Sequence, residues 1–439
     1  MTSGSGALDR AVTAWRAWVD RHATGSAAGE DAHGGPAGAD ARGAAASDSA
    51  HGGPAAPSPG AGRDRSGRLV RVLGAWVRSP LRPRAVRRRP PASPAYRTRV
   101  SVVVPCYNYG RFLPQAVHSL VTQEGVDVEV IVVDDASTDD SLAVARGLAE
   151  QYPEVQVVAG ERNAGQVESF NRGWAHSTGE LVVRLDADDM LPPGALARAA
   201  ALFEQHPEVG LVYGHPRHFD DGTTPRPALG ELTWTVWDGH AWLAERCRTG
   251  VSCITSPEVV MRSALLKDVG PLDPELRFTM DVEMWLRLAA VGDVAYVGGA
   301  DQALHREHAG SLSVNEGSGA LLDLGARVDA YDRLFANVGD RLPHAHRLHD
   351  QARAALARDA LRYAAAAADR PPPGAAAEYL ALAADVWPAS AAWWTTARIT
   401  RRAQRTARTG RAGRGAVVRR IVRRARTELT YLRWATSGL

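Results

Sequence analysis

The sequence predicts an α/β protein: a mostly parallel β-sheet with helices on both faces. Two observations carry this prediction. Between residues 98 and 214, short apolar runs rich in β-branched residues alternate with segments of helical periodicity. The connections are short, and the alternation repeats four times. Buried strands separated by single helices are typical of parallel sheets covered on both faces.

The predicted elements come in a regular order. Strands are expected within 98–108 and at 128–135, 155–160, 180–186 and 209–214. Helices are expected at 114–123, 141–152, 165–177 and 193–206. From 215 to 278 the pattern loosens, with aromatic residues and prolines. A helix is expected again at about 279–290, followed by a strand near VAYVG.

Three regions are expected along the chain. Residues 1–97 are predicted to be a largely disordered Gly/Ala/Pro/Arg-rich extension, because 23–66 hold almost no large apolar residue to bury. Residues 98–315 form the α/β domain. Residues 316–439 are rich in Ala, Leu and Arg at helical spacing, which predicts a small helical region with a break near 371–373 and a basic tail.

Charge is distributed unevenly. The formal net charge is +3, but residues 61–99 hold 12 Arg and one Asp, and residues 401–439 hold 12 Arg and one Glu. The remaining residues hold 28 basic and 47 acidic side chains, a net charge of −19. The run 415–434 places its apolar residues among many arginines. Its apolar positions are Val417, Val418, Ile421, Val422 and Leu429.

Such a basic amphipathic helix suits three partners. It can lie on an anionic membrane surface, pack against the acidic domain, or bind nucleic acid. The first two rank equally. Nucleic acid ranks behind them, because no recognition module accompanies the charge.

Three cysteines show neither a disulfide framework nor metal-ligand spacing, which suits a reducing cytosol. We find no signal-peptide pattern and no apolar run approaching the roughly 20 residues of a membrane-spanning helix. The sequence therefore predicts a cytoplasmic protein. The basic tail also allows peripheral contact with the inner face of the membrane.

Polar clusters follow four of the predicted strands. They are PCYNYG (105–110), DDASTDD (134–140), ERNAGQ (161–166) and DADD (186–189). One such cluster alone is most often an ordinary loop with Asx turns and helix caps. Four in sheet order predict a ligand crevice, since ligands of open α/β sheets bind outside the carboxyl ends of the strands.

The acidic cluster at 186–189 indicates a divalent cation. Closely spaced carboxylates repel one another. Neither G-x-G-x-x-G nor a Walker sequence is present to hold a phosphate. An Mg²⁺ or Mn²⁺ ion that bridges carboxylate and phosphate oxygens would relieve the repulsion. The sequence therefore predicts a metal that arrives with a nucleoside diphosphate.

Three blocks in order resemble one known family. SVVVPCYNYGRFLPQAVHSLVTQ, VEVIVVDDASTDDS and NAGQVESFNRGWAHSTGELVVRLDADDML resemble the nucleotide-sugar-binding half of family-2 glycosyltransferases with the GT-A fold. The resemblance covers about residues 98–315 and implies a GT-A-type sheet there. It also implies an inverting glycosyltransferase that moves a sugar from a UDP- or dTDP-sugar to the hydroxyl of a polysaccharide precursor, a glycolipid or a small-molecule acceptor.

Donor-site residues are implied by the same resemblance. Asp135 would face the nucleotide base, and Pro105, Tyr107 and Asn108 would wrap the nucleobase. Asn163 and Asn171 match polar positions before and within the next helix. For these two asparagines, helix capping or packing is as good an interpretation as ligand contact.

In the acidic block, the resemblance implies that Asp186 contacts the ribose and Asp188 the metal, with Asp189 adjoining as a further metal ligand. LHREHAGSLS (304–313) resembles the block that closes the domain, where His308 would add a metal or diphosphate contact. The alternative for His308 is an ordinary structural or surface residue.

The segment RFTMDVEMWLRLA (277–289) resembles the block that carries the catalytic base, which matches Asp281. Inverting transfer needs a base to accept the proton of the attacking hydroxyl. The alternative is that Asp281 caps its helix. Met280 stands where an acidic residue often precedes the base, which makes Glu283 the fallback.

Other interpretations remain open from sequence. Trp234, Trp237 and Trp242 could stack on sugar rings or form ordinary core. Processive polysaccharide synthesis is disfavoured, because the chain has no Q-x-x-R-W block. A non-catalytic scaffold with a vestigial transferase fold is the alternative from another class. The presence of aspartate at the four positions that the resemblance marks as functional argues against a scaffold. These are Asp135, Asp186, Asp188 and Asp281.

Overall fold

The computed structural model describes residues 81–220, 223–276, 278–308, 320–369 and 374–411, with scattered positions from 415 to 439. The chain divides into two units. The larger unit spans Pro80–Ala425 with Thr436–Leu439 and contains all of the named helices and strands. The smaller, Met1–Ser79 with Arg426–Ala435, lies almost wholly outside the described residues. Most of the extension predicted for 1–97 therefore also lies outside them.

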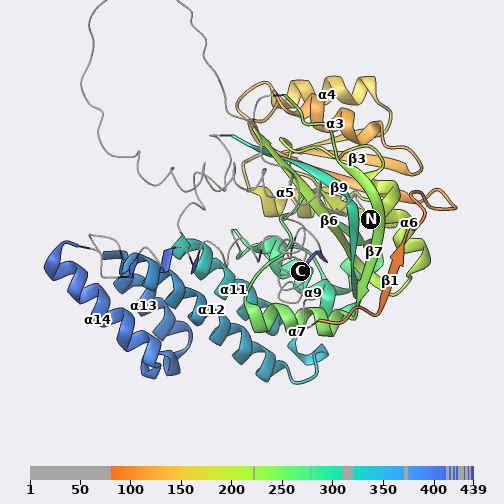
Figure 1. Ribbon diagram of the computed structural model, residues 1–439. Coiled ribbons are helices and arrows are strands. Elements are labelled where there is room, and N and C mark those ends of the chain that lie inside the picture. The colour runs from red at the N-terminus through yellow and green to blue at the C-terminus, as the bar shows by residue number, and fades with distance from the viewer. Residues whose placement is uncertain are drawn as a thin grey trace, which may run out of the picture. The chain divides into compact units, whose positions relative to one another are not determined.

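Half of the sheet is the predicted alternation of strands and helices, and here the sequence prediction is confirmed (Figure 1). Four parallel strands lie side by side in the order β5-β2-β3-β4. The strands are β2 (Arg99–Cys106), β3 (Asp127–Asp134), β4 (Val155–Ala159) and β5 (Leu181–Arg184). The helices between them and after β5 are α3 (Leu113–Val121), α4 (Ser141–Gln151), α5 (Gln166–Ala175) and α6 (Ala195–Gln205).

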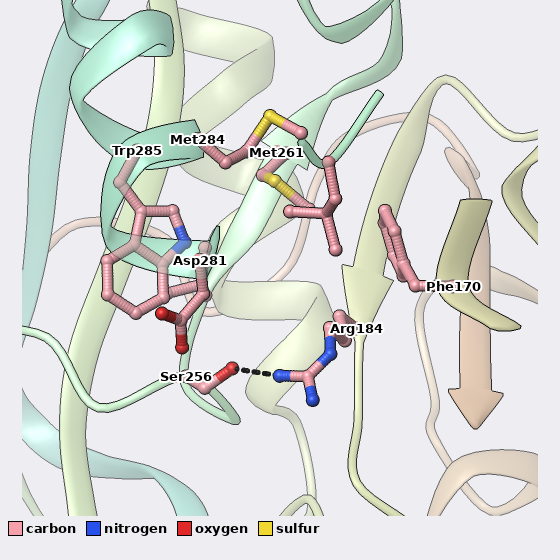
Figure 2. Close-up of a pocket in the computed structure, with 9 residues that line it drawn as sticks. Phe170, Arg184, Ser256, Met261, Asp281, Met284 and Trp285 are labelled. Atoms are coloured by element: carbon pink, nitrogen blue, oxygen red, sulfur yellow. Dashed lines mark hydrogen bonds between the residues drawn. The ribbon is translucent and has the colours of Figure 1, made fainter. Parts of the chain in front are cut away.

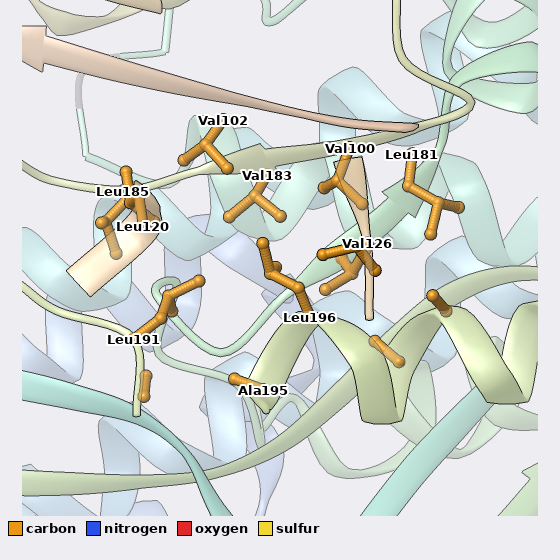
Figure 3. Packing of buried hydrophobic residues seen from close by; sticks show 14 of the residues in the cluster. Val100, Val102, Leu120, Val126, Leu181, Val183, Leu185, Leu191, Ala195 and Leu196 are labelled. Atoms are coloured by element: carbon orange, nitrogen blue, oxygen red, sulfur yellow. The ribbon is translucent and has the colours of Figure 1, made fainter. Parts of the chain in front are cut away.

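Alternate residues of each strand supply the two faces of the sheet. Val100 and Val102 of β2 pack in one buried cluster with Leu120 of α3 and Leu196 of α6 (Figure 3). Val103, one position on, faces α5 instead. Gly173 of α5 lies so close that an added Cβ would approach Val103 to 2.5 Å. The parallel half therefore has helices on both faces, as predicted.

The other half of the sheet is mixed. Among the described residues, nine strands lie in the order β1-β7-β9-β6-β8-β5-β2-β3-β4. Strand β6 (Val209–Asp220) pairs in parallel with β9 (Asp293–Glu307), whereas β7 (Leu229–Trp237) is antiparallel to β9. The short β8 (Val260–Arg262) is antiparallel to both β5 and β6. The stretch 215–278, where the sequence pattern loosens, thus contains the end of β6, β7, β8 and two helices. These are α7 (Gly239–Thr249) and α8 (Ser263–Val269).

One boundary prediction was wrong. Residues 81–97, expected to be disordered, include β1 (Ala85–Arg88), which pairs antiparallel with β7. Arg84 adds an ion pair with Asp293 at 2.6 Å. Both partners lie far along the chain, so nothing local in this Arg- and Pro-rich segment signals a strand.

The helical region predicted after residue 316 is present in the described residues. It comprises α11 (Ala320–Val338), α12 (Ala345–Ala367), α13 (Gly374–Val386) and α14 (Trp394–Thr409), with short 3₁₀ turns at Gly339–Arg341 and Pro388–Ala392. Helix α11 packs on α9 (Met280–Val291), and α12 packs on α7. The break predicted at 371–373 lies outside the described residues.

The basic tail is described only in part. Val417, Val418, Ile421 and Leu429 lie outside the described residues, whereas Val422 is exposed. Arg419 and Arg423 approach the buried carboxylate of Asp369, just after α12, to 2.7 and 3.4 Å. These two tail arginines therefore serve the helical region itself.

Trp234, Trp237 and Trp242 are core residues, with at most 2% of each side chain exposed. Trp237 stacks against the buried Tyr213, and Trp242 meets the same ring edge-on. The interpretation that these rings bind sugar is therefore wrong.

Candidate functional site

The acidic turn directly follows β5. Strand β5 is buried along its whole length, and the turn is closed by a hydrogen bond from the Asp189 N–H to the Asp186 carbonyl oxygen (2.9 Å). The three carboxylates are graded in exposure. The side chain of Asp186 is 37% exposed, that of Asp188 is 12% exposed, and that of Asp189 is fully buried. Only the first two can reach a ligand.

Asp189 has a structural role, which corrects its assignment as a metal ligand. Its Oδ1 accepts the backbone N–H of Arg306 (2.8 Å), and its Oδ2 lies 3.0 Å from His305 Nδ1. Both carboxylate oxygens are thus engaged by the end of β9. This contact holds β9 against the turn and brings His308 close to it.

Asp188 is the carboxylate of the turn whose ionised form is disfavoured by its surroundings. Burial, together with the neighbouring charges of Asp189 and Asp186, raises its pKa to about 8. His308 Nε2 lies 3.0 Å from its Oδ2. The His308 ring in turn packs against Phe112, at 4.9 Å between ring centroids. Asp188 and His308, which lie 120 residues apart in sequence, therefore do meet.

Arg184, the last residue of β5, was missed from the sequence. It is nearly buried and donates hydrogen bonds to Asp186 Oδ1 (2.6 Å) and to Gln166 Oε1 (2.8 Å) through its NH2, and to Ser256 Oγ (2.9 Å) through its NH1. The available signal was the single cation in LVVRLD: a charged residue in a buried strand needs partners.

Asp281 lies in the first turn of α9 and lines a mostly apolar pocket together with Arg184. Figure 2 shows its carboxylate and the Arg184 guanidinium on either side of the Ser256 hydroxyl. Other residues lining the pocket are Phe170, Met261, Met284 and Trp285. Burial raises the pKa of Asp281 to about 6, while the charge of Arg184 acts to lower it and that of Asp186 to raise it.

Asp281 accepts one backbone N–H at the start of α9, but it is not the N-cap residue of that helix. Its Oδ1 accepts the N–H of Val282 (2.7 Å), but the residue preceding the helix is Thr279. Glu283, the fallback base, is excluded by its contacts. It is fully buried, 2.8 Å from Arg287 Nε, and accepts a hydrogen bond from Asn337 Nδ2 (3.1 Å). Glu283 therefore stabilises the packing of α9 against α11.

The loops after β3 and β4 are tied together by Asp135. Its buried carboxylate accepts the N–H groups of Ala164 (3.0 Å) and Gly165 (2.7 Å). Asn163 is exposed, and its Oδ1 accepts the Gly165 N–H at 3.2 Å. Both residues thus lie at the rim of the sheet where the sequence places the base-binding end of the crevice.

The loop after β2 is tied to the loop after β3 in the same way. Asn108 adopts a left-handed backbone conformation (φ 59°), and its Oδ1 accepts the Thr138 N–H (2.8 Å). Its own N–H donates to Ser137 Oγ (3.0 Å). The neighbouring Tyr107 is 40% exposed, and Pro105 still belongs to β2. The carboxyl ends of adjacent strands therefore present these side chains together.

Asn171 has a packing role, which settles the alternative left open for it. Its Nδ2 donates to the Leu272 carbonyl oxygen, and its Oδ1 accepts the Leu272 N–H, both at 2.9 Å. This reciprocal pair fastens α5 to the loop before α9. Its side-chain amide is therefore occupied by the protein.

Within the described ranges, no group of three or more His, Cys, Asp or Glu side chains is arranged to hold a metal ion. Asp188, with Asp186 or His308 beside it, supplies a partial ligand set. Mg²⁺ is commonly held by one or two carboxylates together with phosphate oxygens of a substrate. The donor set thus fits a metal that is completed by a nucleotide.

Part of this chain is similar to a known family and to known sequences. Residues 101–269 match the model of Glycosyl transferase family 2. An uncharacterized glycosyltransferase of Nostoc sp. is 35% identical over 184 residues, which cover 40% of this chain and 54% of that protein. An uncharacterized protein of Mycobacterium tuberculosis is 29% identical over 207 residues, 45% of this chain and 64% of that protein. The matches thus span between half and two thirds of these relatives.

A solved structure with a similar fold is that of Staphylococcus aureus TarS, residues 1–349, in complex with UDP-GlcNAc. The TM-score is 0.50 with 17% sequence identity, and the match covers 77% of this chain and 90% of that one. This likeness concerns the fold and confirms the predicted GT-A-type architecture. Among the helices that the structure describes, none is long and apolar enough to cross a membrane.

Proposed function

We propose, from the match of residues 101–269 to the model of Glycosyl transferase family 2, that the protein is an inverting glycosyltransferase. It moves a sugar from a nucleoside diphosphate sugar to an acceptor hydroxyl. One observation carries the proposal. Arg184 donates to Asp186 of the acidic turn and lines the same pocket as Asp281, whose pKa responds to both residues. A donor-binding carboxylate and a candidate base therefore share one small region.

In this proposal the donor nucleotide lies along the carboxyl ends of β2, β3 and β4. Asp135, Asn163, Tyr107 and Asn108 border that edge. The exposed Tyr107 ring offers a face for a base. We propose a UDP- or dTDP-sugar as donor; the UDP-GlcNAc complex of the S. aureus neighbour supports a uridine nucleotide.

Asp188, assisted by Asp186 and His308, would hold the Mg²⁺ or Mn²⁺ ion. Burial and the neighbouring charges of Asp189 and Asp186 raise the pKa of Asp188, and a bound cation would favour its ionised form. A bound ion would stabilise negative charge on the departing diphosphate.

The chemical step uses Asp281 as its base. The acceptor oxygen attacks the anomeric carbon and forms the new C–O bond, while its proton passes to the Asp281 carboxylate. The bond from the anomeric carbon to the diphosphate oxygen breaks, and the nucleoside diphosphate leaves with that electron pair. With a pKa of about 6, Asp281 is ionised at neutral pH and still basic enough to accept a proton.

The acceptor stays at the level of chemical class: a carbohydrate, a glycolipid or a small molecule with a free hydroxyl. A role in cell-wall or polysaccharide synthesis and a cytoplasmic location are part of the same proposal. Of the basic tail, the described Arg419 and Arg423 contact Asp369, and a membrane contact through the remainder of this tail is part of the same proposal.

A donor panel tests the proposal. The full chain is mixed with UDP-, dTDP- and GDP-sugars, with and without Mn²⁺, and its melting temperature and donor hydrolysis are measured. We expect one nucleotide class to raise the melting temperature only with metal, since a ligand of the folded state stabilises it. Asp188→Ala should abolish the metal-dependent shift. Asp281→Asn should keep the shift and lose turnover by at least about 10²-fold.

Two results would contradict the proposal. One is the absence of any melting-temperature shift across the whole panel. The other is turnover by Asp281→Asn that equals the native rate. The first result with a well-folded chain would favour the non-catalytic scaffold.

A further inference from the structure

Helix α14 (Trp394–Thr409) presents a continuous basic face. Its sequence, WTTARITRRAQRTART, holds five arginines and no acidic residue. Trp394, Arg398, Arg401, Arg405 and Arg408 are exposed. At 3.6 residues per turn, these five positions fall within an arc of about 80° on one side of the helix. The face is therefore one stripe of four cations with an aromatic ring at its N-terminal end.

The opposite side of α14 attaches it to the helical region. Ile399 and Thr406 are buried, and Thr406 Oγ1 donates to the Ala368 carbonyl oxygen (2.9 Å). Arg402, on the flank, lies 3.6 Å from Asp369. The packing thus fixes which side of the helix points away from the protein.

The stripe has no anionic partner within the described part of the chain. The guanidinium carbon of Arg398 lies over the Trp394 ring, 4.1 Å from its centroid. No carboxylate among the described residues forms an ion pair with Arg398, Arg401, Arg405 or Arg408. The Trp394 side chain itself is 68% exposed. Four aligned cations and an exposed indole thus face outward together.

We propose that this face of α14 is a docking surface for an anionic phospholipid membrane. Arginine guanidinium groups bind phosphate oxygens, and basic residues near a membrane are drawn to its negative surface potential. An indole favours the boundary between headgroups and acyl chains. Outside the two Arg-rich segments the chain carries a net charge of −19, so contact of those residues with an anionic surface is disfavoured.

Nucleic acid offers phosphates as well, but the stripe lacks what nucleic-acid surfaces add. A single-strand groove interleaves several aromatic rings with its cations, whereas this face has one ring at its end. A membrane surface therefore explains both the arginines and the single exposed indole of this face, whereas nucleic acid explains only the arginines. The inference stands on α14 alone and does not depend on the sugar-transfer reaction.

Vesicle sedimentation tests the proposal. The full chain is sedimented with vesicles of phosphatidylcholine alone and of phosphatidylcholine with phosphatidylglycerol (3:1), without any sugar donor. We expect binding only to the anionic vesicles, weakened by 0.5 M NaCl. Arg401→Gln/Arg405→Gln should weaken binding about tenfold or more. Trp394→Ala should weaken the part of the binding that survives salt.

A matched control removes the same charge elsewhere. Arg146 on α4 and Arg347 on α12 are also exposed helix residues, so Arg146→Gln/Arg347→Gln should bind within about twofold of native. Circular dichroism and melting temperature check that each variant folds. Equal losses from both double variants, or no binding of the native chain to anionic vesicles, would overturn the proposal. So would tighter binding to an oligonucleotide than to vesicles through the same arginines at 0.15 M salt.

Discussion

At the scale of single residues, the electrostatics of the pocket make a pH prediction. Burial raises the pKa of Asp281, the charge of Arg184 acts to lower it, and the resulting pKa is about 6. A base must be ionised, so kcat/KM should fall about tenfold per unit as pH drops below 6. Arg184→Met removes the cation, so the pKa of Asp281 should rise. The fall of kcat/KM on the acid side of the pH profile (the acid limb) should then begin at a higher pH. Arg184→Lys, which keeps the charge, should move it less.

The measurement is kcat/KM between pH 5 and 9 for the three proteins, at an Mn²⁺ concentration that is saturating at every pH and with the donor that the nucleotide-sugar panel identifies. A role for Arg184 that is only structural would lower the rate without moving the limb. An acid limb at the same pH in native and Arg184→Met proteins would therefore contradict the electrostatic coupling of Arg184 to Asp281.

Asp188 predicts a second pH dependence. With a pKa of about 8, its carboxyl group carries a proton at neutral pH when no cation is bound. Metal binding must displace that proton, so the affinity for Mn²⁺ should rise with pH up to about 8, by up to tenfold per unit. Titration of free Mn²⁺ by electron paramagnetic resonance measures this. Asp188→Asn should bind weakly and with no such slope. If the affinity of the native protein for Mn²⁺ did not change with pH, the assignment of Asp188 as a metal ligand would be contradicted.

At the scale of elements, two glycines within helices give opposite predictions. Gly147 of α4 has open space where a Cβ would stand, whereas a Cβ on Gly173 of α5 would meet Val103 at 2.5 Å and Val133 at 2.7 Å. Gly147→Ala should therefore stabilise the protein by up to about 1 kcal/mol through helix propensity. Gly173→Ala should destabilise it by about 1–3 kcal/mol through overpacking.

Denaturant unfolding of the two variants beside the native chain measures both free energies, and each variant is the control for the other. If Gly173→Ala were as stable as Gly147→Ala, α5 would not lie as close to β2 and β3 as the structure has it.

The elements that the sequence predicted are those whose signal is local. The β-branched runs of β2, β3 and β5 and the spacing of α3 to α6 are visible within about ten residues. Strands β1, β7 and β8 were missed because the sequence pattern around them did not indicate strands, and only their tertiary pairing identifies them: Ala85 pairs with Val236, and Met261 pairs with both Val182 and Leu211. Such antiparallel pairs depend on the tertiary fold more than on propensity.

The same distinction separates the site residues. Asp135, Asp186, Asp188 and Asp281 could be proposed from motifs that follow a strand or open a helix. The structural roles of Asp189 and Glu283 could not, because their partners His305 and Asn337 lie 116 and 54 residues away. For Asn171 the sequence left packing and ligand contact open, because its partner Leu272 lies 101 residues away. A polar residue in a motif has the same letter whether it binds a ligand or another part of the chain.

At the scale of the whole molecule, opposite charges are concentrated in different parts of the chain, and some meet. The tail arginines Arg419 and Arg423, together with Arg402, surround Asp369, whose pKa is lowered although burial alone would raise it. At the other end of the described chain, Arg84 contacts Asp293. Part of each Arg-rich segment is therefore used to complete the fold.

Truncation of the N-terminal segment tests the part that concerns β1. A chain that begins at residue 81 keeps β1 and the Arg84–Asp293 ion pair, whereas a chain that begins at residue 91 loses both and leaves β7 as an unpaired edge. The shorter chain should melt roughly 5 °C lower than the longer one, since a loss of about 2 kcal/mol shifts the melting temperature of a large domain by this much. It should also aggregate more with rising concentration, because an exposed strand edge pairs with other chains. Differential scanning calorimetry and light scattering compare the two truncated chains directly, so effects of residues 1–80 cancel. Equal melting temperatures would mean that β1 adds nothing to the stability of the sheet, and that the ordered domain starts at residue 98 in energetic terms after all.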